Sequence, residues 1–126
     1  MSTQSNAVGW FEIYVADMER AKKFYQAVIQ RELSDLPSTD GAQMCAFAWE
    51  GKSGGSAGAL VKSGKMGPGS GGTLVYFSCD DCAAEVARVA PAGGKVWQTK
   101  IPIGPYGFIA IVQDTEGNTI GLHSMK

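Results

Sequence analysis

Large side chains fill both faces of residues 8–15, where β-branched and aromatic residues predominate. This composition is typical of a β-strand. Because successive strand side chains point to opposite faces, one face carries Phe11, Ile13 and Val15, and the other carries Trp10, Glu12 and Tyr14. We therefore expect a strand that is covered on both sides.

The next segment has helical spacing. The carboxylate of Asp17 can accept a free N–H of a first helical turn, so it predicts an N-cap. Apolar residues then recur three or four positions apart, which predicts a core-facing stripe of Met18, Ala21, Tyr25 and Val28. We expect the solvent side of this helix to carry Lys22, Lys23 and Gln26.

The rest of the first half reads as short extended segments. A short segment at 32–36 leads into the turn-rich residues 37–41, and residues 44–49 are typical of a strand. A weaker strand pattern follows at 57–61. Residues 51–72 contain nine glycines, which favours a connection between two halves.

The same order of elements then begins again. Residues 73–78 read as a strand, Asp80 or Asp81 can cap a short helix, and residues 91–94 end it because proline and glycine disfavour its continuation. Three strands are predicted after this helix, at residues 95–100, 108–113 and 118–123, the last two joined by a tight turn at 114–118.

A supersecondary unit repeated without evident residue identity predicts two βαβββ modules. The expected fold class is α+β, with two βαβββ modules forming curved mixed sheets around a cleft. We expect one domain over residues 1–126, with module 1 at about 7–62, a glycine-rich linker at about 63–72 and module 2 at about 73–124.

Residues 10–25 resemble the opening strand and helix of the vicinal oxygen chelate superfamily, the family of glyoxalases, bleomycin resistance proteins and extradiol dioxygenases. Residues 92–96 and 107–122 resemble its second-half signature, although Thr115 stands where many members have proline. The order and spacing of these motifs carry the resemblance over almost the whole chain outside its glycine-rich middle.

The resemblance implies four positions for divalent-metal ligands, usually His or Glu, on the opening and last strands of each module. Matching the motifs puts Trp10, Thr73 and Gly121 at three of them. The fourth falls in residues 51–79, which contain no Asp, Glu or His. None of these residues is a suitable ligand, so the sequence predicts neither a metal site nor another cofactor.

Two titratable residues are candidates for catalysis. Glu12 is on the strand face expected to border the cleft, where a carboxylate could act as an acid or base, although it could equally be structural. His123, the only histidine, is two residues beyond Gly121 and hence on the same strand face. It could bind an anionic group or move a proton, or it could be a surface residue.

Six aromatic side chains could form the walls of a ligand cleft, and any one could instead belong to the core: Trp10, Trp49, Tyr76, Trp97, Tyr106 and Phe108. Tyr106, between Pro105 and Gly107, is the strongest candidate for a mobile contact. The ligand-binding residues predicted from these considerations are Trp10, Glu12, Thr73, Tyr106, Phe108, Gly121 and His123.

Two further motifs are weaker indications of a functional site. Cys79 and Cys82 have CxxC spacing at a strand-to-helix junction, but the intervening aspartates oppose thiolate formation. Residues 67–72 are glycine-rich, yet a phosphate-binding loop leads into a helix, and this segment precedes a predicted strand.

Eleven Lys and Arg against twelve Asp and Glu give a net charge of −1, which does not favour nucleic acid or anionic membranes as partners. The N-terminal residues lack a secretory pattern and the three cysteines do not suggest a disulfide framework, so we expect a cytoplasmic protein. The resemblance implies a homodimer.

The favoured hypothesis is a member of this superfamily that binds a small aromatic or amphipathic molecule in a metal-free cleft. The alternative is a glyoxalase-type lyase or isomerase with an unorthodox divalent-metal site built from Glu12 and His123, and a structural or partner-binding module remains open. The sequence does not decide whether the protein is an enzyme, but the lack of His or Glu at the implied ligand positions disfavours metal-dependent glyoxalase activity.

Overall fold

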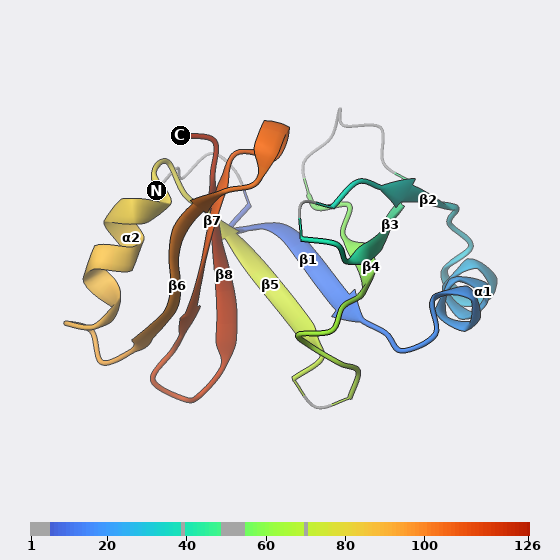
Figure 1. Ribbon diagram of the computed structural model, residues 1–126, viewed down its shortest axis with the longest axis horizontal. Helices are drawn as coiled ribbons and strands as arrows, with labels where there is room; N and C mark the ends of the chain where they lie inside the picture. Colours follow the sequence, from blue (N-terminus) through green and yellow to red (C-terminus); the bar gives the residue numbers. More distant parts are fainter. Residues whose placement is uncertain (1–5, 39, 49–54, 70) are drawn as a thin grey trace. The chain divides into compact units, whose positions relative to one another are not determined.

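The computed structural model describes residues 6–38, 40–48, 55–69 and 71–126. Strand, helix and three strands follow one another twice along the chain (Figure 1). The first module consists of β1 (Val8–Tyr14), α1 (Met18–Ile29), β2 (Leu33–Leu36), β3 (Gln43–Phe47) and β4 (Ala59–Lys62). The second consists of β5 (Thr73–Ser78), α2 (Cys82–Val89), β6 (Lys95–Pro102), the 3-10 turn η1 (Gly104–Tyr106), β7 (Phe108–Gln113) and β8 (Thr119–Ser124). The predicted α+β fold of two βαβββ modules with mixed sheets is confirmed.

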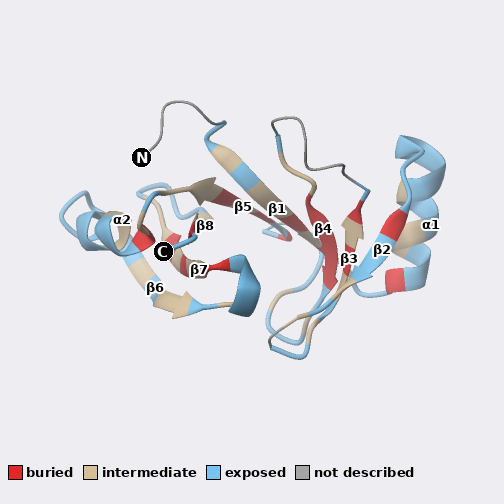
Figure 2. Cartoon of the chain, turned by 90° about the horizontal axis from the view of Figure 1, so that it is seen from above, coloured by how far each residue is buried: buried red, intermediate tan, exposed pale blue. Residues whose placement is uncertain are grey.

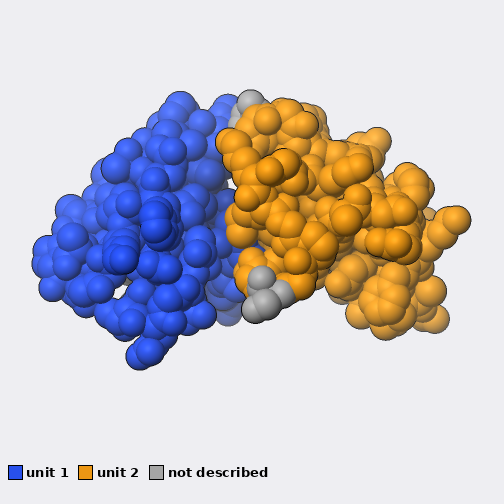
Figure 3. Space-filling view, turned by 60° about the horizontal axis from the view of Figure 1, so that its bottom comes forward, with its two compact units in different colours: residues 1–10, 74–126 blue, residues 11–73 orange. Residues whose placement is uncertain are grey.

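The chain separates into two compact units, coloured in Figure 3. Unit 1 comprises residues 1–10 and 74–126, and unit 2 comprises residues 11–73. The start of β1 thus belongs with the second module: the Ser78 N–H donates to the Ala7 carbonyl at 2.9 Å. Each unit has its own apolar cluster and is described separately below.

In unit 2 the strand order is β2-β3-β4-β1, with β4 parallel to β1 and antiparallel to β3. β4 is buried over most of its length (Figure 2). The alternation predicted for β1 is confirmed, because Phe11, Ile13 and Val15 pack against an apolar cluster under α1. The buried members of this cluster are Met18, Leu33, Cys45, Phe47 and Leu60.

Helix α1 begins as predicted at Asp17, whose carboxylate accepts the Arg20 N–H at 3.0 Å. Met18, Ala21 and Tyr25 face the apolar cluster, but the side chain of Val28 is 59% exposed. Helical spacing predicted Val28 for the core; it is exposed because the last turn of α1 lies beyond the cluster. Among the described residues, no helix has the length and apolar character needed to cross a membrane.

In unit 1 the strand order is β5-β8-β7-β6, with β5 parallel to β8 and the other pairs antiparallel. Helix α2 covers one face of this sheet. Its N-cap is Asp81, whose carboxylate accepts the Ala83 N–H at 3.0 Å and the Lys100 ammonium at 2.9 Å. The buried residues of the cluster between α2 and the sheet are Cys82, Ala110, Val112 and Leu122.

The turn between β7 and β8 is organised by Asp114. Its Oδ1 accepts the N–H groups of Glu116 at 2.8 Å and Asn118 at 2.9 Å, and its Oδ2 accepts the Asn118 side-chain amide at 3.0 Å. Gly117 supplies the positive φ of 83° that the turn needs. These bonds fix the pairing of β7 with β8, in which Gln113 lies opposite Thr119.

Candidate functional site

The face of the unit 1 sheet that α2 leaves uncovered carries two of the predicted site residues, Gly121 and His123. Leu122 packs under α2, so its neighbours Gly121 and His123 point to the opposite side. Strand register gives this helix-free face its other members: Tyr76 pairs with Gly121, while Ser78 and Ile109 pair with His123. We define the helix-free face of unit 1 by these five residues.

The ring of Tyr76 lies directly against the backbone of Gly121. A methyl group placed on Gly121 would overlap the Tyr76 ring atoms Cδ1 and Cε1. Tyr76 is buried, with 6% of its surface exposed. The space that a side chain at position 121 would occupy is therefore filled by an aromatic ring.

The imidazole of His123 is held by the η1 turn. Its Nε2 lies 2.5 Å from the Tyr106 carbonyl oxygen. The turn is closed by a 2.9 Å bond from the Ile103 N–H to the Gly107 carbonyl, and Gly107 has a φ of 98°. The Tyr106 side chain is 44% exposed, so the turn places an exposed aromatic group next to the histidine.

In unit 2 the second candidate acid or base, Glu12, is buried on the side of β1 opposite the apolar cluster. It is 9% exposed, and Tyr14, two residues along the strand, donates its hydroxyl proton to Glu12 Oε1 at 2.6 Å. The register of β1 with β4 places Ala59 beside Glu12 and Val61 beside Tyr14. This arrangement is a buried carboxylate–phenol pair flanked by apolar residues on its β4 side.

The other predicted ligand-binding residues lie elsewhere. Phe108 packs into the cluster under α2, on the opposite face from His123, and the Lys100 ammonium lies 4.6 Å from its ring centre. Trp10 is half-buried on β1 in unit 1, and Thr73 is exposed at the start of β5 in unit 2. Trp49, considered with the aromatic set, is outside the described residues.

Ile109 was missed by the sequence predictions, whereas Tyr76 was predicted only as one of six aromatic residues that could form a cleft wall. Ile109 could have been found from the β7–β8 turn, because antiparallel pairing about residues 114–118 places it opposite His123. Tyr76 offered no equivalent signal, since the register of the parallel strands β5 and β8 is not set by a tight turn.

The CxxC residues have the properties of structural thiols, with Cys82 buried and Cys79 half-buried. All three cysteines are free, and Cys82 and Cys45 have no exposed surface. Burial and the neighbouring Glu85 raise the pKa of Cys79 to about 12. A thiol with such a high pKa is a poor nucleophile and a poor metal ligand near neutral pH.

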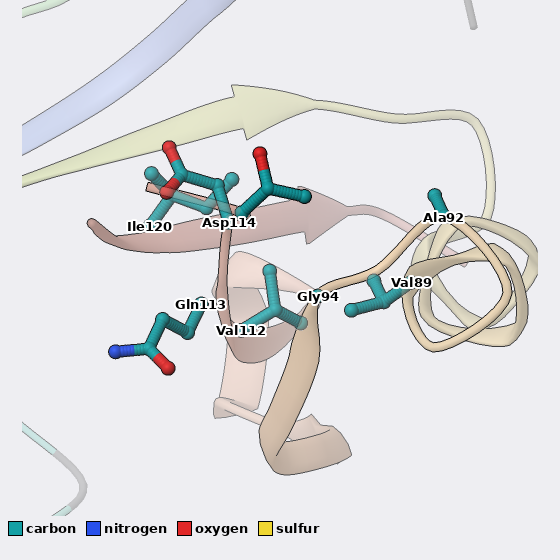
Figure 4. Close-up of a pocket in the computed structure, with 8 residues that line it drawn as sticks. Val89, Ala92, Gly94, Val112, Gln113, Asp114 and Ile120 are labelled. Atoms are coloured by element: carbon teal, nitrogen blue, oxygen red, sulfur yellow. The ribbon is translucent and has the colours of Figure 1, made fainter. Parts of the chain in front are cut away.

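A shallow pocket in unit 1 lies apart from the helix-free face, between the end of α2 and the β7–β8 turn (Figure 4). Its volume is about 230 Å³ and its lining is chiefly apolar, including Val89, Val112 and Ile120. Ligand pockets usually exceed about 300 Å³ and contain converging polar groups. The dimensions of this hollow therefore do not favour a ligand site.

The comparison with known proteins decides the family. The family model for the glyoxalase/bleomycin resistance protein/dioxygenase superfamily matches residues 7–122. The chain belongs to this superfamily.

The relatives in this superfamily include proteins of Mycobacterium tuberculosis and Mycobacterium bovis named as a candidate glyoxylase, CFP32, with 28% identity over 118 residues. The match covers 90% of this chain but 43% of each relative, so the chain spans less than half of their length.

Solved structures of similar fold include two methylmalonyl-CoA epimerases. The Mycobacterium tuberculosis enzyme is 17% identical with a TM-score of 0.68, covering 100% of this chain and 93% of that one. A Streptomyces coelicolor variant, in complex with 2-nitronate-propionyl-CoA, is 16% identical with a TM-score of 0.71, covering 96% and 98%. At these identities the likeness establishes the shared fold.

The divalent metal of the superfamily's enzymes does not fit the residues present here. The ring of Tyr76 fills the space beside Gly121, where the resemblance places a ligand. No cluster of three or more His, Cys, Asp or Glu side chains suited to a metal occurs within residues 6–38, 40–48, 55–69 and 71–126. Glu12 and His123, the proposed unorthodox ligands, are bonded to Tyr14 and to the Tyr106 carbonyl respectively.

Proposed function

We propose that this superfamily member binds a small aromatic or amphipathic molecule on the helix-free face of unit 1, without a metal ion. The observation that carries the proposal is the contact of the Tyr76 ring with Gly121. The resemblance assigns Gly121 to a metal-ligand position, and the buried Tyr76 ring occupies the space that a ligand side chain would need there. Flat aromatic side chains provide large apolar contact at low entropic cost, which suits an aromatic ligand.

Three of the predicted ligand-binding residues belong to this proposed site: Gly121, His123 and Tyr106. Gly121 leaves room for the Tyr76 ring, His123 provides a polar group, and Tyr106 provides an exposed aromatic side chain. A small number of polar groups within an apolar lining is the usual composition of small-molecule sites. The roles of Trp10, Glu12, Thr73 and Phe108 stay predictions.

Two kinds of compound are reasonable probes. Planar aromatic compounds match the aromatic surface directly. Acyl-CoA esters are included because the similar Streptomyces coelicolor structure contains one, and their adenine rings are planar and aromatic. We favour planar aromatic compounds, because the aromatic side chains of the proposed site belong to this chain, whereas the CoA ester is bound by a structure that is only similar to it.

Tryptophan fluorescence during titration with a library of both classes tests the proposal. Binding in the micromolar range should change the emission, and Tyr106→Ala should weaken binding by about tenfold if one aromatic contact contributes about 1.4 kcal/mol. Phe24→Ala is the matched control, because Phe24 is another exposed aromatic residue, on α1 of unit 2, with 57% of its surface exposed. No emission change with any compound would contradict the proposal.

Metal analysis distinguishes this function from the lyase or isomerase alternative. We expect purified protein to contain substoichiometric nickel, zinc or manganese and to gain no thermal stability when these ions are added, because a ligand of the folded state would stabilise it. Stoichiometric metal with increased stability would favour the enzyme. The homodimer implied by the resemblance is tested on the same sample by light scattering.

A further inference from the structure

His123 contacts a backbone carbonyl, and a carbonyl oxygen can only accept a hydrogen bond. The 2.5 Å approach of Nε2 to the Tyr106 oxygen therefore requires the proton to be on Nε2. In a neutral imidazole one ring nitrogen carries the proton and the other is an acceptor. The η1 turn thus selects the tautomer in which Nδ1 is unprotonated.

The acceptor of this hydrogen bond is fixed in position by the fold. Gly107 follows Tyr106 and packs closely against the end of β8. A methyl group on Gly107 would overlap the Ser124 carbonyl oxygen. The turn is also closed by the Ile103–Gly107 bond. The Tyr106 carbonyl is therefore held beside His123 by the backbone of two adjacent segments, independently of any ligand.

The second ring nitrogen of His123, Nδ1, is the one available to accept a hydrogen bond from a ligand. Within the described part of the chain, no residue forms a hydrogen bond with Nδ1 of His123, and the side chain is half-buried. Its neighbours on the helix-free face include Ile109, Gly121 and Ser78. Nδ1 is not one of the buried, unpartnered polar atoms of the described residues, so it is accessible to an incoming ligand. An accessible acceptor beside the apolar Ile109 side chain favours a ligand that combines an apolar ring with a proton donor.

We propose that Nδ1 of His123 accepts a hydrogen bond from a neutral donor on the ligand, such as a phenolic hydroxyl or a heterocyclic N–H. This inference rests on the proposed binding function and narrows its ligand class. A neutral His123 in this tautomer has no proton to offer a carboxylate or phosphate at Nδ1. Ligands that carry a hydroxyl next to an aromatic ring should consequently bind better than their O-methyl counterparts.

The tautomer is measured first in the ligand-free protein. Because the chain has a single histidine, two-bond ¹H–¹⁵N correlation at alkaline pH reports this ring alone. We expect Nε2 to resonate as a protonated nitrogen and Nδ1 as an unprotonated one. The opposite pattern, with the proton on Nδ1, overturns the inference without any variant being made.

Ligand preference is measured next by calorimetry with 1-naphthol and 1-methoxynaphthalene. One net hydrogen bond of about 1 kcal/mol predicts about fivefold tighter binding of 1-naphthol. The same complex should shift the Nδ1 resonance, whereas the 1-methoxynaphthalene complex should not. In His123→Gln the side-chain amide can still donate to Tyr106, so folding should be kept and the preference for 1-naphthol lost.

The outcomes separate this inference from the proposed function. Equal binding of both naphthalenes, with an unmoved Nδ1 resonance, overturns the acceptor role and leaves aromatic binding intact. Absence of binding by both compounds and by the wider library contradicts the binding function, and the acceptor role with it. Preferential binding of 1-naphthol that survives in His123→Gln also overturns the inference, because another group must then accept the bond.

Discussion

The ring of Tyr76 lies against the backbone of Gly121, across the parallel pair β5–β8. The two residues are complementary: the absence of a side chain at one creates the space for the aromatic ring of the other. Four predictions follow from this and other contacts of the described residues.

Gly121→Ala should destabilise the protein, because its methyl group would overlap the Tyr76 ring. Overpacking of this kind costs about 1–3 kcal/mol, which urea unfolding can measure. In the double variant with Tyr76→Ala the ring is gone, so the added methyl group should cost much less. Gly64→Ala is the control, since no other described part of the chain lies within 4 Å of a methyl group there. Strictly additive effects of the two substitutions would contradict the contact.

Tyr14→Phe should lower the free energy of unfolding by about 1–3 kcal/mol, because it removes a hydroxyl that donates to a buried carboxylate, Glu12. Tyr25→Phe is the matched control. Tyr25 is a tyrosine of the same unit that packs against the unit 2 apolar cluster, and its hydroxyl has no hydrogen-bond partner within the described residues. We expect that control to change stability by less than about 0.5 kcal/mol. Similar losses for both variants would show that the Tyr14–Glu12 bond contributes nothing specific.

Cys79 should react slowly with thiol reagents in the native state. Burial and Glu85 raise its pKa to about 12, so the thiol stays protonated at pH 8, while in the unfolded chain a substantial fraction is thiolate. Because the folded pKa lies above the unfolded one, the native state binds more protons in this range, and stability falls as pH rises from about 8.5 toward 12.

Ellman titration of native and urea-unfolded protein measures the reactivity, and Cys79→Ser should lessen the alkaline loss of stability. Rapid native labelling of Cys79 at pH 8 would argue against the raised pKa and revive a chemical role for the CxxC motif.

Asp81→Asn should destabilise α2 at neutral pH and much less in acid. The Lys100 ammonium, followed by the Ala83 N–H, lowers the pKa of Asp81 below its ordinary value of 3.8. The stabilisation is present above that value and is lost as pH falls through the folded-state pKa. Glu116→Gln, an equal charge change at an exposed turn residue, controls for net charge. An equal loss at pH 6 and at pH 2.5 would contradict an ionised Asp81 as the stabilising form.

Most of the fold could be predicted from the sequence because its signals are local. Asp17 caps α1 as expected, and the β7–β8 turn lies at the predicted residues. Val28 has the right helical spacing for the core, but its side chain is exposed. The extent of the apolar cluster depends on tertiary packing, which helical spacing does not predict. The 3-10 turn at η1 was likewise read as a loop, although Pro105 and two flanking glycines are compatible with it.

The candidate site was predictable in part. Gly121 and His123 lie on one face, as strand alternation requires. Phe108 was chosen for its aromatic character, yet the same alternation sends its side chain under α2 and gives the position near His123 to Ile109. The contact of Tyr76 with Gly121 depends on the register between β5 and β8, which no local pattern specifies.

The turn held by Asp114 has a consequence for anyone who exchanges loops between members of this superfamily. Side chains along a strand alternate with a period of two, so inserting or deleting one residue at 114–118 can move β8 by one step relative to β7. Such a step would turn Gly121 and His123 toward α2 and bring Leu122 to the other side. The length of a surface turn that contributes no residue to the proposed site therefore determines which side chains this face of the sheet can present.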